Sequence, residues 1–204
     1  MPGTSAYSEP AQTVTYEEKV KRSVFIANVS ACHSGGEARE FLTLITSQHR
    51  DATHNCRAYV LSGGEEYSSD DGEPSGTAGR PILNAIKRSG LVNVMVIVTR
   101  YFGGVKLGVR GLIDAYGDTA AKALEHCGRV ERVKTRGVTV SLGYSSVGNV
   151  THLLEGTGAS GLLWDYGESV NVSAEVPVNL YDSLARRLDE LTARGIITKW
   201  ENVS

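Results

Sequence analysis

The chain has 204 residues with a formal net charge of −2, and 41% of its residues are apolar and 22% charged. This composition is typical of a folded globular protein and argues against a fibrous or disordered one. No apolar stretch reaches the roughly 18 residues of a membrane helix, and residues 1–12 lack the basic start and apolar run of a secretory signal, so we expect a cytoplasmic protein without membrane contact.

The first part of the chain predicts strands and helices in irregular alternation. Thr77 is a candidate cap for one helix, because Pro81 would then fall in the first turn, where proline is tolerated. The apolar run before Arg100 predicts a buried strand. We expect strands at about Val14–Val20, Ser23–Val29, Cys56–Leu61 and Leu91–Thr99, and helices at about Gly36–Ser47, from Thr77 onward and within Gly108–Cys127.

In the last part of the chain, the apolar periodicity is more regular and predicts four strands and two helices. The expected order is strand, helix, strand, strand, helix, strand, which is the ferredoxin-like βαββαβ pattern. The fold class is therefore α+β. The segments are Val138–Leu142, Val147–Leu154, Gly161–Tyr166, Ser169–Val176, Leu180–Leu191 and Gly195–Trp200.

A change in charge separates these two parts. Up to Arg136 the chain has 17 basic and 15 acidic residues, and from Gly137 onward it has 4 and 8. We therefore predict two domains, residues 1–136 and 137–204. The acidic second domain is a poor candidate for nucleic-acid contact, because attraction to phosphate dominates such binding.

The strongest functional pattern is an acidic stretch followed by a basic one. Residues 65–73 contain five acids and no base, whereas residues 74–113 contain six bases and no acid. Some bases should neutralise the acids, and the surplus should form a positive face. The bases are Arg80, Lys87, Arg88, Arg100, Lys106 and Arg110.

Glycines cluster before two of the predicted helices within the same segment. Free amides at a helix N-terminus that a ligand can approach through glycine form an anion site, and phosphate is the expected anion. Neither loop has the Gly-Lys-Ser/Thr of a phosphate-binding P-loop or a Gly-x-Gly-x-x-Gly, which disfavours a nucleoside triphosphatase or a dinucleotide enzyme. The candidate anion- or RNA-binding residues besides the six bases are Gly76, Thr77, Gly79, Tyr101, Phe102, Gly103, Gly104 and Gly108.

The acidic stretch offers an alternative in which the site is catalytic. Paired carboxylates beside an anion site can divide acid and base roles, with His54, Asp70, Asp71 and Glu73 as the candidates. His54 and Cys56 share a strand face, but three metal ligands are not visible in the sequence. We expect no metal and no cofactor.

At the same residues the sequence strongly resembles the IMPACT/YigZ family. The motifs that carry the resemblance are Tyr67-Ser-Ser-Asp-Asp-Gly-Glu-Pro-Ser-Gly-Thr-Ala-Gly-Arg-Pro-Ile82, Val98-Thr-Arg-Tyr-Phe-Gly-Gly-Val-Lys-Leu-Gly108, Lys21-Arg-Ser-Val-Phe-Ile26 and Ala52-Thr-His-Asn-Cys-Arg-Ala58. They extend the resemblance, together with the second domain, over nearly the whole chain.

The resemblance implies a first domain with the fold of elongation factor G domain IV, including a left-handed βαβ crossover, and a small ferredoxin-like second domain as in the bacterial members. Family members generally have no established catalytic activity, and RNA or ribosome binding is what the resemblance suggests.

Two positions depart from the family pattern. Where the family continues with a Gly-Thr-Gly-Gly-like turn, this chain has Val109-Arg110-Gly111, and Asp114 replaces a basic residue before Ala115-Tyr116. Arg110 and Asp114 are four residues apart, so we expect them to form an ion pair on the helix.

Three functions remain open from the sequence. The first is a non-catalytic RNA- or ribosome-associated protein, with the six bases on phosphates, Tyr101 or Phe102 stacking on a base, and no DNA sequence specificity. The second is an adaptor that binds a protein partner in translation control. The third is an enzyme acting on a small anionic substrate.

Overall fold

The computed structural model describes residues 6–203 and separates into two compact units. The first is Tyr7–Arg132, and the second begins at Val133. Both contain helices packed on sheets, which confirms the α+β class. Among the described residues, no helix is both long and apolar enough to cross a membrane.

The first unit is built on a five-stranded sheet in the order β2-β3-β6-β4-β5, with every neighbouring pair antiparallel. Strands β3 and β4 both pair with β6, so they run parallel to each other and are joined through a helix. The strands are β2 (Val14–Val20), β3 (Ser23–Ala31), β4 (His54–Val60), β5 (Glu66–Ser69) and β6 (Val94–Tyr101).

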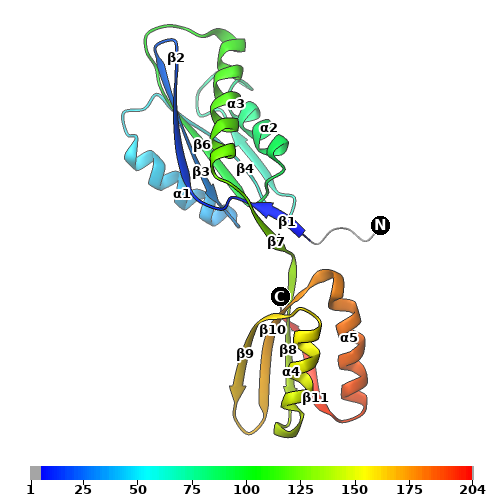
Figure 1. Ribbon diagram of the computed structural model, residues 1–204. Coiled ribbons are helices and arrows are strands. Elements are labelled where there is room, and N and C mark those ends of the chain that lie inside the picture. The colour runs from blue at the N-terminus through cyan, green and yellow to red at the C-terminus, as the bar shows by residue number, and fades with distance from the viewer. Residues whose placement is uncertain (1–5, 204) are drawn as a thin grey trace. The chain divides into compact units, whose positions relative to one another are not determined.

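Helices cover both faces of this sheet (Figure 1). Helices α2 (Gly79–Ser89) and α3 (Gly108–His126) pack on one face, and α1 (Gly35–Gln48) lies on the other. Strand β6 alternates between the two cores, because Val96 and Val98 face α2 and α3 while Met95 and Ile97 face α1. This double burial explains why its sequence is continuously apolar.

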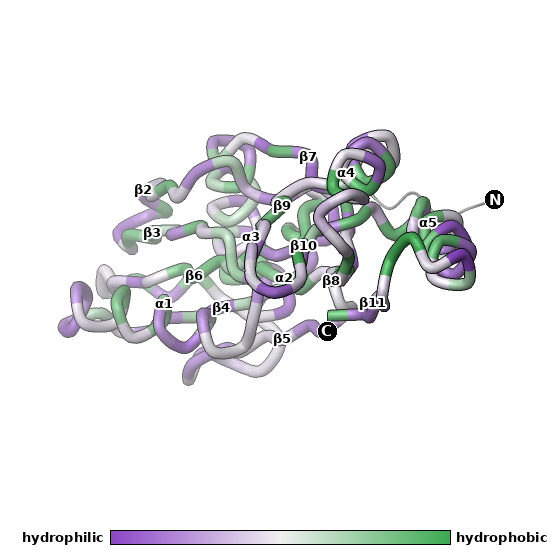
Figure 2. Tube along the Cα trace, turned by 90° about the horizontal axis from the view of Figure 1, so that it is seen from below, coloured by the Kyte–Doolittle hydropathy of each residue, from purple (hydrophilic) through white to green (hydrophobic). Residues whose placement is uncertain are grey.

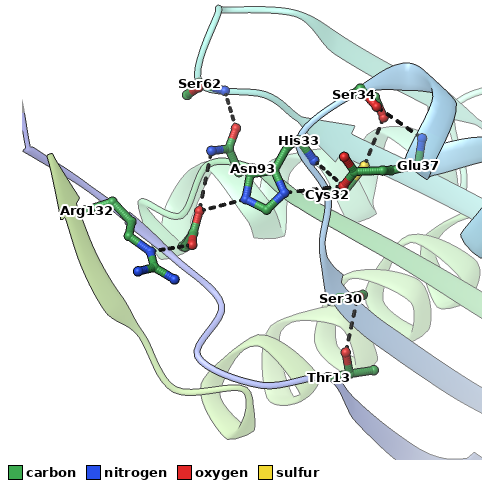
Figure 3. A network of polar contacts seen from close by, with 10 residues as sticks. Thr13, Ser30, Cys32, His33, Ser34, Glu37, Ser62, Asn93 and Arg132 are labelled. Carbon is green, nitrogen blue, oxygen red and sulfur yellow. Dashed lines mark hydrogen bonds and ion pairs between the residues drawn. The ribbon is translucent and has the colours of Figure 1, made fainter. Parts of the chain in front are cut away.

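A short two-stranded sheet joins β1 (Ala6–Glu9) to β7 (Val130–Val133). The buried Glu9 carboxylate accepts hydrogen bonds from Arg132 Nε at 2.7 Å and Asn93 Nδ2 at 3.4 Å, and lies 3.1 Å from His33 Nε2. These three partners converge in Figure 3. Glu9 therefore links β1 to β7, to the start of β6 and to the segment before α1.

The second unit follows the order β8, α4, β9, β10, α5, β11, and its sheet has the antiparallel strand order β11-β8-β10-β9. Tyr181, Leu184 and Leu188 form the buried stripe of α5, and Figure 2 shows both apolar and polar colours on this helix. The bounds are β8 (Thr135–Leu142), a 3-10 turn (Tyr144–Ser146), α4 (Val147–Gly156), β9 (Ser160–Tyr166), β10 (Val170–Pro177), α5 (Val178–Ala193) and β11 (Ile197–Val203).

The longer predicted elements are all present, with ends shifted by a few residues. Strands β1, β5 and β7 were not predicted, because each is only four residues long and has no clear apolar alternation. The helix expected from Thr77 begins at Gly79 instead, with Ala78 at the cap position. Cys32, Cys56 and Cys127 are buried free thiols.

Candidate anion-binding site

Both glycine loops lie at one edge of the first unit's sheet. Strands β5 and β6 run parallel, because each is antiparallel to β4, and α2 and α3 start after the ends of β5 and β6 respectively. Both helix N-termini therefore lie at the edge where β5 and β6 end. The pairing of His54 with Arg100 and of Val24 with Tyr101 brings the start of β4 and the β2–β3 turn to the same edge.

At the start of α2, the chain's own carboxylate occupies the anion position. Asp70 Oδ1 accepts from the amides of Ala78 and Gly79 at 2.9 and 2.8 Å, and Oδ2 accepts from the Gly76 amide at 2.8 Å. Burial alone would raise the pKa of Asp70, but these hydrogen bonds hold it below its ordinary value. The expectation that Gly76 and Gly79 offer free amides to a ligand is therefore wrong.

Thr77 does not cap α2 either. Its hydroxyl donates to the Pro74 carbonyl at 2.6 Å and stabilises the loop instead. Gly79 has a packing role, because a Cβ atom there would lie 2.7 Å from the Ser69 backbone nitrogen. The predicted helix start lies two residues before the observed one, and the pattern did not indicate that Asp70, eight residues before Ala78, would accept hydrogen bonds from its first amides.

The start of α3 contrasts with that of α2. Like α2, it has no hydrogen-bonding side chain at its cap residue, Leu107, and no acidic residue in its first turn. Unlike α2, whose first amides bind Asp70, it has no carboxylate bound to its first amides among the described residues. The first amides of a helix have no partner inside the helix and lie at its positive end. Lys106 and Arg110, both exposed, add two charges beside them. The start of α3 is therefore the candidate position for an anion that is not part of this helix.

A cavity of about 490 Å³ lies beside this helix start and includes residues from both glycine loops. His54 and Glu73 come from the acidic side, and Arg100, Phe102 and Lys106 come from the basic side. The remaining wall is largely apolar. It consists of Thr53, Pro74, Leu107, Gly108, Val109 and Leu112.

Arg100 is buried in this wall and does not lie on an open positive face. Its Nη1 donates to Glu73 Oε1 at 2.5 Å, and its Nη2 donates to Ser23 Oγ at 3.3 Å. The guanidinium lies over the rings of Phe25 and Phe102, at 5.5 and 5.4 Å from their centroids. Arg100 is thus a fixed, desolvated cation and not a mobile phosphate contact.

Glu73 also accepts a hydrogen bond from Tyr116 Oη at 2.8 Å. Burial, with the neighbouring Cys56 and Glu73, raises the pKa of Tyr116, so its phenol remains a proton donor. Burial likewise raises the pKa of Cys56 to about 12, and its thiol donates to the Asp70 carbonyl at 2.9 Å. Cys56 is therefore not a nucleophile at neutral pH.

His54 faces Glu73 across the cavity wall, with Nε2 3.9 Å from Oε1. Its other ring nitrogen, Nδ1, lies 2.7 Å from the Asp71 carbonyl oxygen and can donate to it. This contact favours the tautomer in which Nε2 is free to accept a hydrogen bond. Asp71 itself accepts from the Asn55 amide at 2.8 Å and pairs with Arg57 at 3.2 Å.

The other predicted bases are distributed more widely. Lys87 pairs with Glu66 at 2.7 Å, and Arg88 lies at the far end of α2 beside Arg129. Tyr101 contacts His49 at 2.9 Å on the α1 side. None of these three residues lines the cavity.

The ion pair expected between Arg110 and Asp114 is absent among the described residues, although both side chains are exposed.

Gly103 is needed for packing, because a Cβ atom there would lie 1.8 Å from the Arg22 carbonyl oxygen. Gly104 and Gly108 have φ angles of +81° and +77°, which favour glycine.

Two basic residues missed as site candidates lie at the same edge. Lys21 and Arg22 form the β2–β3 turn and are exposed. Their place in one of the family motifs was the available signal. Within the part of the chain that the structure describes, five exposed bases at this edge form no ion pair. They are Lys21, Arg22, Arg80, Lys106 and Arg110.

These features define a mixed α+β protein with a basic edge and a partly apolar cavity. Residues 21–124 match the family model described as the Impact N-terminal domain. The chain is 38% identical over 179 residues to IMPACT family member YvyE of Bacillus subtilis, covering 87% of this chain and 82% of that protein. It is 34% identical over 149 residues to IMPACT family member YigZ of Escherichia coli, covering 71% and 73%.

The chain therefore belongs to the IMPACT family. A crystal structure of a hypothetical protein is similar over 98% of both chains, with a TM-score of 0.72 and 28% identity.

Proposed function

We propose that this protein is a non-catalytic RNA- or ribosome-binding protein that acts in translation and contacts RNA phosphates through the basic edge. The basic edge is the set Lys21, Arg22, Arg80, Lys106 and Arg110. The observation that carries the proposal is that these five exposed bases form no ion pair with any described residue and lie at the edge of the sheet where α3 starts without a side-chain cap. Phosphate contacts of this kind supply most of the affinity in sequence-independent RNA binding.

The uses of the carboxylates support a non-catalytic role. Asp70 caps α2, Asp71 holds β4 and Arg57, and Glu73 pairs with Arg100. Each has a structural partner among the described residues. The resemblance to the IMPACT/YigZ family adds the context of translation.

We further propose that the first unit has the fold of elongation factor G domain IV, with its left-handed crossover through α1, and that the second unit is ferredoxin-like. The proposed division at residue 136 lies within β8 and four residues beyond the last residue of the first unit, Arg132. The second unit, with its acidic composition, then serves a role other than phosphate contact.

The test is the affinity for a fluorescently labelled single-stranded RNA, measured by anisotropy at one fixed salt concentration. The double variant Lys106→Glu and Arg110→Glu should bind at least about tenfold more weakly, because two attractive charges become repulsive. Lys199→Glu, on the exposed surface of the second unit, is the control for a single charge reversal away from the edge and should bind as the parent does. Equal weakening by the control, or no RNA binding by the parent, would contradict the proposal.

A protein adaptor is the main competing function. Pull-down from lysate with and without nuclease separates the two, because partners held through RNA are lost on digestion and directly bound proteins are retained.

A second candidate function, an enzyme acting on a small anionic substrate, is favoured by one observation. His54 lines the cavity, and its Nδ1 lies 2.7 Å from the Asp71 carbonyl oxygen, which leaves Nε2 available as a general base. Thermal-shift measurements with anionic metabolites, followed by assays of turnover of any that bind, test it. A ligand that is consumed by the parent and not by His54→Ala would establish catalysis.

A further inference from the structure

The cavity beside α3 contains a buried cation that is incompletely satisfied. The Arg100 side chain is 6% exposed, and its Nε has no hydrogen-bond partner among the described residues. Buried polar groups in proteins are nearly always paired, and each exception needs an explanation. Because Arg100 lines the cavity, a ligand bound there could supply an acceptor for the unpaired Nε donor.

The polar groups of the cavity lie around an apolar wall. The helix start at Gly108 and Val109, with Lys106 beside it, provides positive potential for a phosphate group. Leu107 and Leu112 provide an apolar wall, and His54 with Glu73 provides hydrogen-bonding groups. A volume of about 490 Å³ is within the range of small-molecule sites. Inorganic phosphate would leave most of it empty.

Phe102 gives the cavity a planar apolar surface. It is 47% exposed, and Arg100 lies over its ring at 5.4 Å. An exposed aromatic ring beside an arginine is the arrangement on which single nucleobases stack. The hydrogen-bonding edge of a stacked base requires polar partners, which His54 and Glu73 can supply.

We infer that this cavity binds one nucleotide, with its phosphate at the start of α3 and its base against Phe102. The inference deepens the proposed function and rests on it, since the same edge would hold the rest of an RNA chain. The nucleotide is either free or the unpaired end of an RNA. The two sources share the chemistry of one phosphate and one base.

The test is the affinity of the full chain for nucleoside monophosphates and for inorganic phosphate, measured by isothermal titration calorimetry. We expect at least one nucleoside monophosphate to bind at least about tenfold more tightly than inorganic phosphate. Val109→Trp should then weaken nucleotide binding about tenfold, because Val109 is 62% exposed at the cavity and the larger side chain fills it. Leu163→Trp, which is 73% exposed in the second unit, is the control.

The same variants separate this inference from the proposed function. Val109→Trp leaves the charges of the basic edge in place, so its affinity for circular single-stranded RNA should stay within about threefold of the parent. Linear RNA that loses affinity in this variant while circular RNA does not would identify the RNA end as the source. Affinity of the variant for both RNAs that stays within about threefold of the parent, while monophosphate binding is lost, would identify a free nucleotide.

Monophosphates that bind no more tightly than phosphate, or that bind Val109→Trp as well as the parent, would overturn the inference even if RNA binding is found. Nucleotide binding without RNA binding would support the cavity site and overturn the RNA function. If neither ligand binds, both proposals fail.

Discussion

Asp70 shows how one side chain can change the interpretation of a loop. A glycine-rich helix start beside basic residues predicts a phosphate site, and at α2 the structure has an internal carboxylate in that position. The acid and the amides it binds are up to nine residues apart, so only the turn of the loop brings them together. The sequence pattern could not distinguish an internal anion from an external one.

Asp70→Asn should therefore lower the stability of the first unit by about 2 kcal/mol at neutral pH, since an amide replaces a charged cap. The pKa of Asp70 is lowered by folding. Its stabilising effect is thus present above its unfolded pKa and is lost as the pH falls through the lower folded pKa. The variant should lack this part of the acid dependence.

The measurement is urea unfolding of both proteins between about pH 7 and pH 3. Unfolding should be monitored by hydrogen exchange of peptides from the first unit. Tryptophan fluorescence would not report on this unit, because the chain's two tryptophans, Trp164 and Trp200, lie in the second unit. Asp51→Asn, at an exposed position, is the control. Identical unfolding curves for Asp70→Asn and the parent would show that the cap contributes nothing.

Glu9 gives a second acid-sensitive contact, at the β1–β7 sheet. Burial alone would raise its pKa, but hydrogen bonds from Arg132, His33 and Asn93 hold the pKa below its ordinary value. The contact should stabilise the unit above the unfolded pKa of Glu9 and weaken as the pH falls through the folded one. Glu9→Gln should raise amide exchange in β1 and β7 at neutral pH by about tenfold, as loss of roughly 1.4 kcal/mol of local stability requires. Exchange unchanged in both strands would contradict this role.

At the scale of elements, the long strands and helices were predictable because each has one dominant pattern. Strand β6 is apolar on both faces, and the predicted helices of the second unit carry one apolar stripe. Short strands such as β5 were not predictable, because four residues contain too little periodicity. The site was only partly predictable: the two glycine loops were identified, but Arg100 was expected on a surface and is buried against Glu73 and Phe25.

Gly103 joins two elements that are far apart in the sequence. We predicted that Gly103 lets a ligand approach the backbone. In the structure, its lack of a side chain instead allows the loop after β6 to contact the β2–β3 turn at Arg22. Gly103→Ala should destabilise the first unit by about 2–3 kcal/mol, because backbone must move to remove the clash. Gly63→Ala, where no atom lies within 4 Å of the new Cβ, should change stability by less than about 0.5 kcal/mol. Hydrogen exchange of both variants checks the difference, and equal stability would show that the loop yields easily.

At the scale of the whole molecule, the charge differs between the two predicted domains, although the first unit itself is balanced, with 15 basic and 15 acidic residues. Basic residues exceed acidic ones up to Arg136, and acidic residues exceed basic ones beyond it. The basic edge belongs to the first unit alone, so we propose that this unit contacts RNA. This asymmetry was visible in the sequence, whereas the convergence of two loops on one cavity depended on the strand order.

The most direct test of the central claim is the salt dependence of RNA affinity. If the five bases of the basic edge each neutralise a phosphate, the logarithm of the association constant for single-stranded RNA should fall against the logarithm of salt concentration with a slope of about −3.5. Arg22→Ala should make the slope about 0.7 less negative. A slope near zero, or one that Arg22→Ala and the double variant Lys106→Ala and Arg110→Ala leave unchanged, would contradict RNA binding through this edge.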